Sequence, residues 1–169
     1  MTIDDGVIQS LETSISAESM AVIGLGNLDR ADDGVGLALV SRLQVYLPER
    51  IFLETEHNVE ALVLRLLDRE DIQTILFIDA THFGGEPGHV RFFRVENSRQ
   101  FFPVVSTHQV PLSLLMNMIV DHGKLPFLLG IQPKSVQLFG PMSLEVQETM
   151  NLLEKVIIEF LLKDQRKFS

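Results

Sequence analysis

The stretch GLGNLDRADDGVG, residues 24–36, follows an apolar run at residues 20–23 and carries three aspartates in a glycine-rich turn. A buried strand that leads through such a turn into a helix is the first unit of an α/β fold. These turns commonly cradle phosphate, but this one departs from G-x-G-x-x-G at its last glycine, and no Walker lysine with Ser or Thr follows. Its negative charge would also repel a phosphate. The stretch therefore predicts an α/β fold and argues against a nucleotide site.

The glycines of this stretch are predicted to shape the turn. Gly24 and Gly26 let the chain turn tightly off the strand, and the side chain of Asn27 can hold the turn. Gly34 and Gly36 are predicted to let the start of the helix pack close to the sheet.

The rest of the chain repeats the strand-then-helix order. The predicted strands are residues 20–25, 51–54, 74–79, 89–95 and 127–131, and the predicted helices are residues 32–47, 59–67, 112–121 and 143–162. TILFID at 74–79 is apolar until its final acid, which is typical of a central parallel strand. HVRFFRV at 89–95 alternates, which favours an edge or antiparallel strand. Five strands and four helices, with Asn58 and Ser143 as predicted N-caps, fit a three-layer α/β/α sandwich.

Length and composition favour one globular domain. The 169 residues, 46% of them apolar, suffice for one well-filled core and are too few for two. We therefore expect a single domain over residues 1–169, with residues 1–18 as a short N-terminal helix or an arm.

Charge and residue usage exclude several classes of function. A formal net charge of −9 makes a nucleic-acid partner implausible, because phosphate contacts need clustered Lys and Arg. The absence of cysteine excludes disulfides, thiolate catalysis and Cys-type zinc sites. No run approaches the roughly 20 apolar residues of a membrane span, and the N-terminus lacks a basic leader. We expect a cytoplasmic protein with no membrane partner.

Acids and histidines follow the predicted strands. In an open α/β sheet, ligands bind beyond the carboxyl ends of the strands. That rule collects residues 26–33, 54–58 and 79–82, and His108 joins them if the loop at 104–111 folds over the same edge. Two carboxylates and one imidazole suit Zn, Ni, Mn or Fe, with coordination positions left open.

Each of these residues also has a structural interpretation. Of the two adjacent acids, Asp32 is the better candidate for a helix cap, which leaves Asp33 as the candidate ligand, although Asp33 can equally be a cap. Asp79 ends an apolar strand, where a carboxylate must be solvated, paired or metal-bound. His108 and His82 fit surface loops equally well. His57 has the same ambiguity.

A covalent acyl mechanism has no evident nucleophile. The chain contains no G-x-S-x-G elbow and no cysteine. It also lacks an H-E-x-x-H helix and a further clustered histidine, so a general metallohydrolase of small molecules is the weakest of the enzymatic alternatives.

Four ordered motifs resemble those of the [NiFe]-hydrogenase maturation endopeptidases, which trim the C-terminus of the hydrogenase large subunit. They are GLGNLDRADDGVG at 24–36, ILFIDATHFGGEPGHVR at 75–91, STHQVPLSLL at 106–115 and LLGIQP at 128–133. The resemblance implies a three-layer sandwich of the phosphorylase/hydrolase-like kind, with a five-stranded, mostly parallel mixed sheet and one antiparallel strand.

The resemblance also implies the site and its chemistry. Asp33, Asp79 and His108 match the family's metal ligands and are the predicted catalytic residues. The nickel is implied to arrive with the large-subunit precursor, although other divalent metals can occupy such a site. Whether the metal polarises the scissile carbonyl or activates water, or whether an acid acts as general base, stays open.

The chain departs from the family pattern at two places. Residues 54–58, Glu-Thr-Glu-His-Asn, replace an Asp-Gly-Gly-Thr type of stretch, and His82 stands where relatives commonly have an acid. His82 can supply a ligand or a proton, or simply be solvated. The predicted function is cleavage of a nickel-loaded precursor, and the alternative is a chaperone that binds nickel or precursor without cutting.

Overall fold

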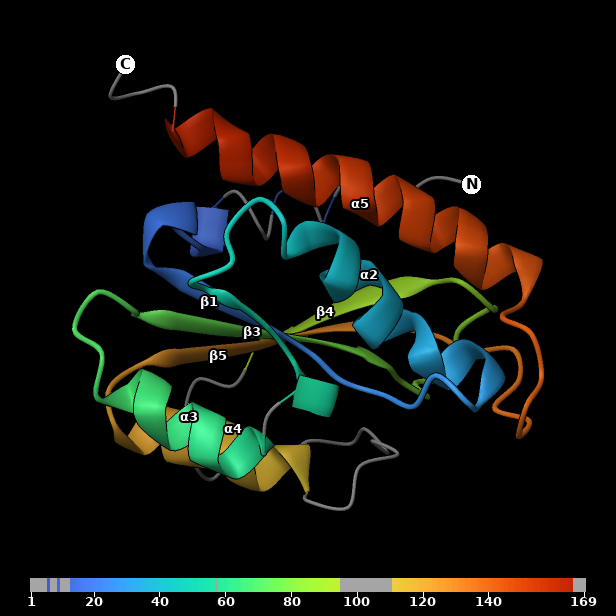
Figure 1. Ribbon diagram of the computed structural model, residues 1–169, viewed down its shortest axis with the longest axis horizontal. Helices are drawn as coiled ribbons and strands as arrows, with labels where there is room; N and C mark the ends of the chain where they lie inside the picture. The colour runs from blue at the N-terminus through green and yellow to red at the C-terminus, as the bar shows by residue number, and fades with distance from the viewer. Residues whose placement is uncertain (1–5, 7–8, 10–12, 57, 95–110, 166–169) are drawn as a thin grey trace.

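The computed structural model describes residue 6, residue 9 and the ranges 13–56, 58–94 and 111–165. In this part of the chain a twisted sheet lies between two layers of helices (Figure 1). The predicted three-layer α/β/α sandwich is therefore confirmed. Most of the predicted N-terminal helix or arm lies outside the described residues, as do His57 and His108.

The sheet contains five strands in the order β2-β1-β3-β5-β4. Its strands are β1 (Met20–Gly24), β2 (Ile51–Leu53), β3 (Thr74–Ala80), β4 (Val90–Arg94) and β5 (Leu125–Ile131). All neighbouring pairs are parallel except β4 and β5. The prediction of a central β3 and an antiparallel strand at 89–95 is confirmed, and β4 lies at an edge.

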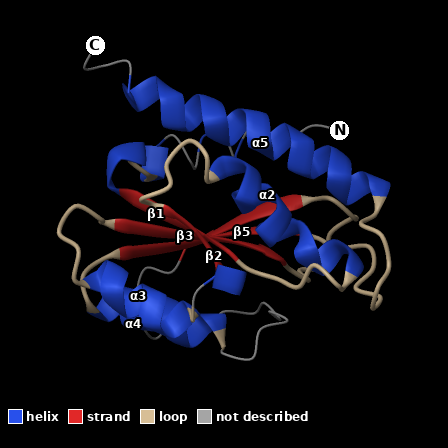
Figure 2. Cartoon of the chain, viewed as in Figure 1, coloured by secondary structure: helices blue, strands red, loops and turns tan. Residues whose placement is uncertain are grey.

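Within the ranges 13–56, 58–94 and 111–165, four α-helices cover the two faces of this sheet. They are α2 (Val35–Leu43), α3 (Val59–Leu67), α4 (Leu112–Asp121) and α5 (Leu144–Gln165). Helices α2 and α5 lie on one face, and α3 and α4 lie on the other (Figures 1 and 2). Each face has its own apolar core, because the strands β1 and β3 are buried on both sides.

The helix boundaries follow from local chemistry. Asn58 caps α3 as predicted, since its side chain accepts a hydrogen bond from the Ala61 amide at 2.9 Å. Helix α2 is shorter than the predicted 32–47: a 3-10 turn at Ala31–Gly34 precedes it, and it ends at Leu43. Among the described residues, no helix combines the length and the apolar character needed to cross a membrane.

Candidate functional site

The candidate site lies at the carboxyl edge of the sheet, where β1 and β3 end side by side. Gly24 pairs with Ile78, and the Leu25 amide donates to the Ile78 carbonyl at 2.9 Å. Asp79 is the next residue of β3, so it lies level with the start of the turn that carries Asp33. The topology therefore brings the two predicted carboxylate ligands to one edge, as adjacent parallel strands require.

Both carboxylates are buried. Asp79 is 0% exposed and pairs across the sheet with Gly130 of β5. Asp33 is 2% exposed and lies in the 3-10 turn between β1 and α2. A carboxylate taken out of water must be compensated by hydrogen bonds, an opposite charge or a metal. Two buried carboxylates, one in β3 and one in the turn after the neighbouring β1, make this edge of the sheet the candidate site.

Backbone hydrogen bonds close the turn that carries Asp33. The Asn27 amide donates to the Asp33 carbonyl at 3.2 Å, and the Asp33 amide donates to the Arg30 carbonyl at 3.0 Å. The Asn27 side chain accepts from the Asp29 amide at 2.9 Å, which confirms its predicted role. These hydrogen bonds within the turn fix the backbone position of Asp33.

Two glycines make this close geometry possible. Gly26 has a φ of +130°, and a Cβ there would lie 2.0 Å from the Asp33 carbonyl oxygen. A Cβ on Gly36 would lie 2.2 Å from the Ile78 carbonyl oxygen, so only glycine lets α2 start against the sheet. Gly24 is not part of the turn: it is the last residue of β1, where a Cβ would meet Val40 at 2.6 Å.

Asp32 does not cap α2, so that prediction is wrong. Neither Ala31–Gly34 nor α2 has a side-chain cap. The Asp32 carboxylate, 0% exposed, instead accepts hydrogen bonds from the segment that follows β5. Its donors are the amides of Lys134 (2.8 Å), Ser135 (3.0 Å) and Ser143 (2.6 Å) and the Ser143 hydroxyl (2.9 Å). Ser143 directly precedes α5 as predicted, but its hydroxyl bonds to Asp32.

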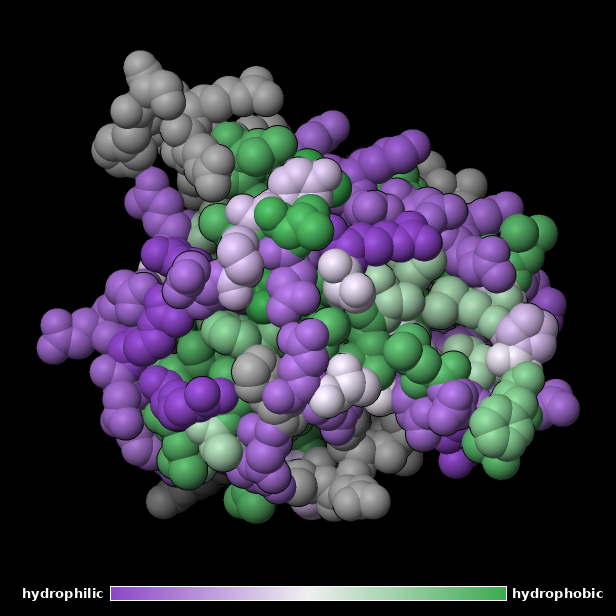
Figure 3. Space-filling view, in the orientation of Figure 1, coloured by the Kyte–Doolittle hydropathy of each residue, from purple (hydrophilic) through white to green (hydrophobic). Residues whose placement is uncertain are grey.

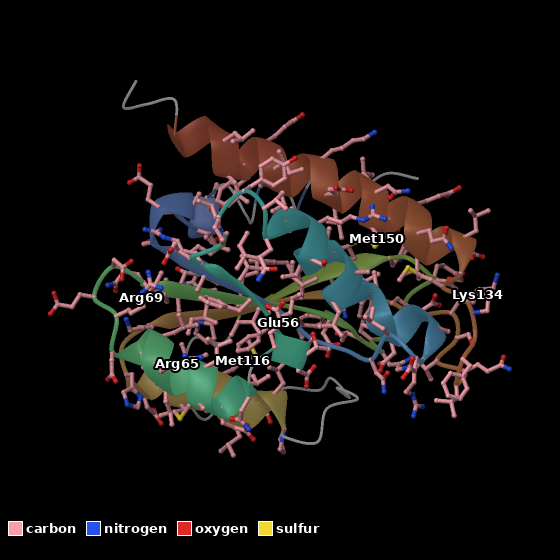
Figure 4. The ribbon with its side chains drawn as sticks, in the orientation of Figure 1. Glu56, Arg65, Arg69, Met116, Lys134 and Met150 are labelled. Carbon is pink, nitrogen blue, oxygen red and sulfur yellow. The ribbon has the colours of Figure 1, made fainter. Side chains whose placement is uncertain are left out.

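The stretch after β2 also contacts this turn. The Gly26 amide donates a hydrogen bond to Glu54 Oε2 at 3.0 Å. Glu54 belongs to the stretch 54–58, which differs from the family pattern, and it supports the turn that carries Asp33. Glu56 accepts from Gln44 at 3.2 Å and lies near the middle of the molecule in Figure 4. The rule of strand ends had placed this stretch at the site without assigning Glu54 a role.

Gln132 organises the stretch after β3, which sequence reasoning missed. Its Oε1 accepts from the amides of Phe83 (2.9 Å) and Gly85 (3.2 Å), and its side chain is buried. Its Nε2 lies 3.3 Å from Nδ1 of the exposed His82. Because Oε1 is engaged by two amides, Nε2 is the donor, and His82 accepts through Nδ1. A polar residue directly after the apolar β5 was the available signal.

The third predicted ligand, His108, lies outside the described residues, and so does His57. In the part of the chain that the structure describes, no group of three or more His, Asp or Glu side chains is placed to hold one metal ion. Within these residues, Asp33 and Asp79 are therefore not joined by a third such side chain.

One ion pair lies at the rim of this end of the molecule, where Figure 4 labels Lys134. Lys134 Nζ donates to Glu145 Oε1 at 2.6 Å. This hydrogen bond, with the positive charge of Lys134, holds the pKa of the Glu145 carboxyl below its ordinary value of 4.5. The pair is exposed, so it ties the segment after β5 to α5 only weakly.

Comparison with known proteins identifies the family. The family model of the HycI hydrogenase maturation proteases matches residues 58–160. A candidate hydrogenase maturation protease of Methanocaldococcus jannaschii is 30% identical over 121 residues, 69% of this chain and 77% of its own. The hydrogenase 3 maturation protease of Escherichia coli K12 is 32% identical over 77 residues, 45% of this chain and 48% of its own.

A solved structure agrees with these sequence matches. The crystal structure of the [NiFe] hydrogenase maturation protease HycI from Thermococcus kodakarensis superposes with a TM-score of 0.67 at 28% identity. The match covers 85% of this chain and 92% of that one. The resemblance seen in the four motifs is thereby confirmed, and the chain belongs to the hydrogenase maturation protease family.

Proposed function

We propose that this chain is an endopeptidase that removes the C-terminal extension of a [NiFe]-hydrogenase large-subunit precursor after nickel has been inserted. The observation that carries the proposal is a pair of buried carboxylates in a member of a protease family: Asp79 lies in β3, and Asp33 lies in the turn after the adjacent parallel strand β1. The relatives' names supply the class of substrate, since they are maturation proteases of hydrogenases.

Asp33, Asp79 and His108 are proposed to recognise nickel that the precursor already holds. Two carboxylates and one imidazole leave coordination positions open, so a nickel ion bound by the substrate can gain ligands without leaving it. Hydrogen bonds within the turn around Asp33 support this role, because they fix the backbone of one ligand before the substrate arrives. The ion then places the neighbouring peptide bond at the carboxyl edge of the sheet.

The test is cleavage of purified precursor followed by mass spectrometry. Wild-type protein should release a C-terminal peptide from nickel-loaded precursor and leave nickel-free precursor intact. Asp33→Asn, Asp79→Asn and His108→Ala should each slow cleavage by about a hundredfold or more. The exposed Asp29 lies in the same turn, so Asp29→Asn is the matched control and should cleave at the wild-type rate.

Two results would contradict the proposal in different ways. If all three site variants cleaved at the wild-type rate, these residues would not form the site. If the wild-type protein bound nickel-loaded precursor without shortening it, the chain would be a non-cleaving chaperone on the same fold.

A further inference from the structure

Three large apolar side chains are exposed beside the candidate site. Leu28 is 62% exposed and lies in the turn between Gly26 and Asp33. Leu138 is 57% and Phe139 78% exposed, and both belong to the segment that follows β5. We call these three residues the apolar surface. Figure 3 shows hydrophobic side chains at this right-hand end of the molecule, where the loops after β1 and β5 lie in Figure 1.

The two segments that carry the apolar surface are bonded to each other. The Phe139 amide donates to the Asp29 carbonyl, and the Asp32 amide donates to the Ser135 carbonyl at 3.0 Å. The buried Asp32 carboxylate accepts four further hydrogen bonds from residues 134, 135 and 143. These bonds fix the backbone on both sides of Leu138 and Phe139, so the surface exists before any partner binds.

Phe139 is held in a costly backbone conformation without being buried. Its φ is +55°, in the left-handed region that bulky residues rarely occupy. In a protein core, the burial of the side chain offsets the free-energy cost of a strained backbone. The Phe139 side chain remains mostly in solvent, so burial does not offset the cost here. Backbone strain at a residue whose side chain is mostly exposed is typical of binding sites, where it presents that side chain to a partner.

The position of this surface points to one occupant. Leu28 packs against the residue that follows Asp33, since a Cβ on Gly34 would lie 3.0 Å from the Leu28 Cα, and Phe139 is bonded to Asp29 of the same turn. A protein whose peptide reaches Asp33 would therefore come close to both side chains. The occupant is therefore the protein substrate and not a small ligand. Exposed apolar side chains at a fixed position are the usual anchors of such contacts.

We propose that Leu28, Leu138 and Phe139 form a pre-formed docking surface for the folded body of the hydrogenase large-subunit precursor, beside the segment that is cut. The proposal rests on the proposed function, because it takes the precursor as the partner. It assigns the surface to binding and leaves the chemical step to the residues of the candidate site.

Kinetics with nickel-loaded precursor test this assignment. Leu28→Ser and Phe139→Ser should each raise KM about tenfold or more and change kcat less than about twofold. The matched control is Val45→Ser: Val45 is 77% exposed and lies between the end of α2 and the start of β2, at the opposite edge of the sheet. It should leave both constants unchanged.

A glycine variant separates binding from structural integrity. Phe139→Gly removes the cost of the positive φ, so its Tm should equal or exceed that of the wild type while KM rises as for Phe139→Ser. Phe139→Leu should restore much of the binding. A lowered Tm in Phe139→Gly with an unchanged KM would mean that Phe139 serves the fold, and the proposal would be overturned.

Failure of this proposal is distinguishable from failure of the proposed function. If the surface variants cleave with wild-type KM while Asp33→Asn is inactive, only the docking surface is wrong. If the wild-type protein binds nickel-loaded precursor without shortening it, the proposed function fails, and weaker binding of that precursor by Leu28→Ser and Phe139→Ser would still support the docking surface. Sedimentation of the wild-type protein adds a third outcome: a homodimer that Phe139→Ser dissociates would make the surface a contact between two copies and overturn the proposal.

Discussion

Asp32 and Ser143, which are 111 positions apart in the sequence, are joined by two hydrogen bonds. The Ser143 amide donates to Asp32 Oδ1 at 2.6 Å, and the Ser143 hydroxyl donates to Oδ2 at 2.9 Å. Together with the amides of Lys134 and Ser135, they attach the start of α5 and the segment before it to the turn that carries Asp33. The Asp32 carboxylate thus connects the loop after β1 to the segment after β5.

Removal of the Asp32 carboxylate should destabilise the protein strongly. Asp32→Ala would leave four donors without their acceptor in a buried position, so we expect the free energy of unfolding to fall by about 3–5 kcal/mol. Ser143→Ala removes only the hydroxyl bond and should cost about 1 kcal/mol. Urea unfolding followed by circular dichroism measures both. Asp29→Ala, in the same turn but exposed, should change stability by less than about 0.5 kcal/mol, and an equal loss there would refute the anchoring role.

The close approach of α2 to the sheet should make Gly36 intolerant of any side chain. A Cβ at Gly36 would lie 2.2 Å from the Ile78 carbonyl oxygen and 2.4 Å from that of Leu25. We expect Gly36→Ala to lower the free energy of unfolding by about 3 kcal/mol or more. The control is Gly84→Ala, where φ is +77° but no atom lies within 4 Å of the added Cβ. It should cost only about 1 kcal/mol, and similar losses at the two positions would contradict the packing argument.

Metal affinity should depend on the proposed ligands. Titration of the free protein with Ni²⁺ in a calorimeter should give an affinity that Asp33→Asn, Asp79→Asn and His108→Ala each reduce by about tenfold or more. His82 is exposed and near Gln132, so His82→Ala should reduce the affinity less than these three if it is not a ligand. A loss at His82 as large as that at His108 would instead assign His82 to the metal.

The ion pair between Lys134 and Glu145 predicts a pH dependence with a defined sign. The pKa of Glu145 is lower in the folded protein than its ordinary value of 4.5, because Lys134 donates a hydrogen bond to it and carries an opposite charge. The contribution to stability is therefore complete above about pH 5 and is lost as the pH falls through the lowered pKa. Glu145→Gln should show a shallower loss of unfolding free energy between about pH 5 and about pH 3 than the wild type. Identical slopes would show that the pair contributes nothing.

Much of the fold could be predicted from local patterns. The apolar run of β3, the alternation of β4 and the helical spacing of α3 and α4 each reflect the burial of one element. The location of the candidate site could also be predicted. Ligands bind beyond the carboxyl ends of the strands in an open α/β sheet, so only the position of each strand is needed. This rule collected Asp33 and Asp79, and the structure buries both, Asp79 in β3 and Asp33 in the turn between β1 and α2. The ligand set itself, including His108, stays a prediction.

The roles of individual polar side chains could not be predicted in this way. Asp32 and Asp33 are adjacent acids in the same turn, and nothing in the local pattern separates an anchor from a candidate ligand. Gln132 likewise had no assigned role until its contacts with the Phe83 and Gly85 amides were known. Asp32 and Gln132 each form hydrogen bonds with a segment that is distant in the sequence. The hydrophobic periodicity of a segment does not indicate such a distant partner.

The sequence by itself thus determined the succession of strands and helices, the glycines that their close packing requires and the family to which the motifs belong. Only the tertiary structure decided which acid holds the segment after β5, and that the exposed Leu28 and Phe139 lie on two segments joined by the hydrogen bond between Phe139 and Asp29. The physical reason is that the spacing of buried residues is a property of one segment, whereas a hydrogen bond between Asp32 and Ser143 exists only after two segments distant in the sequence have folded against each other.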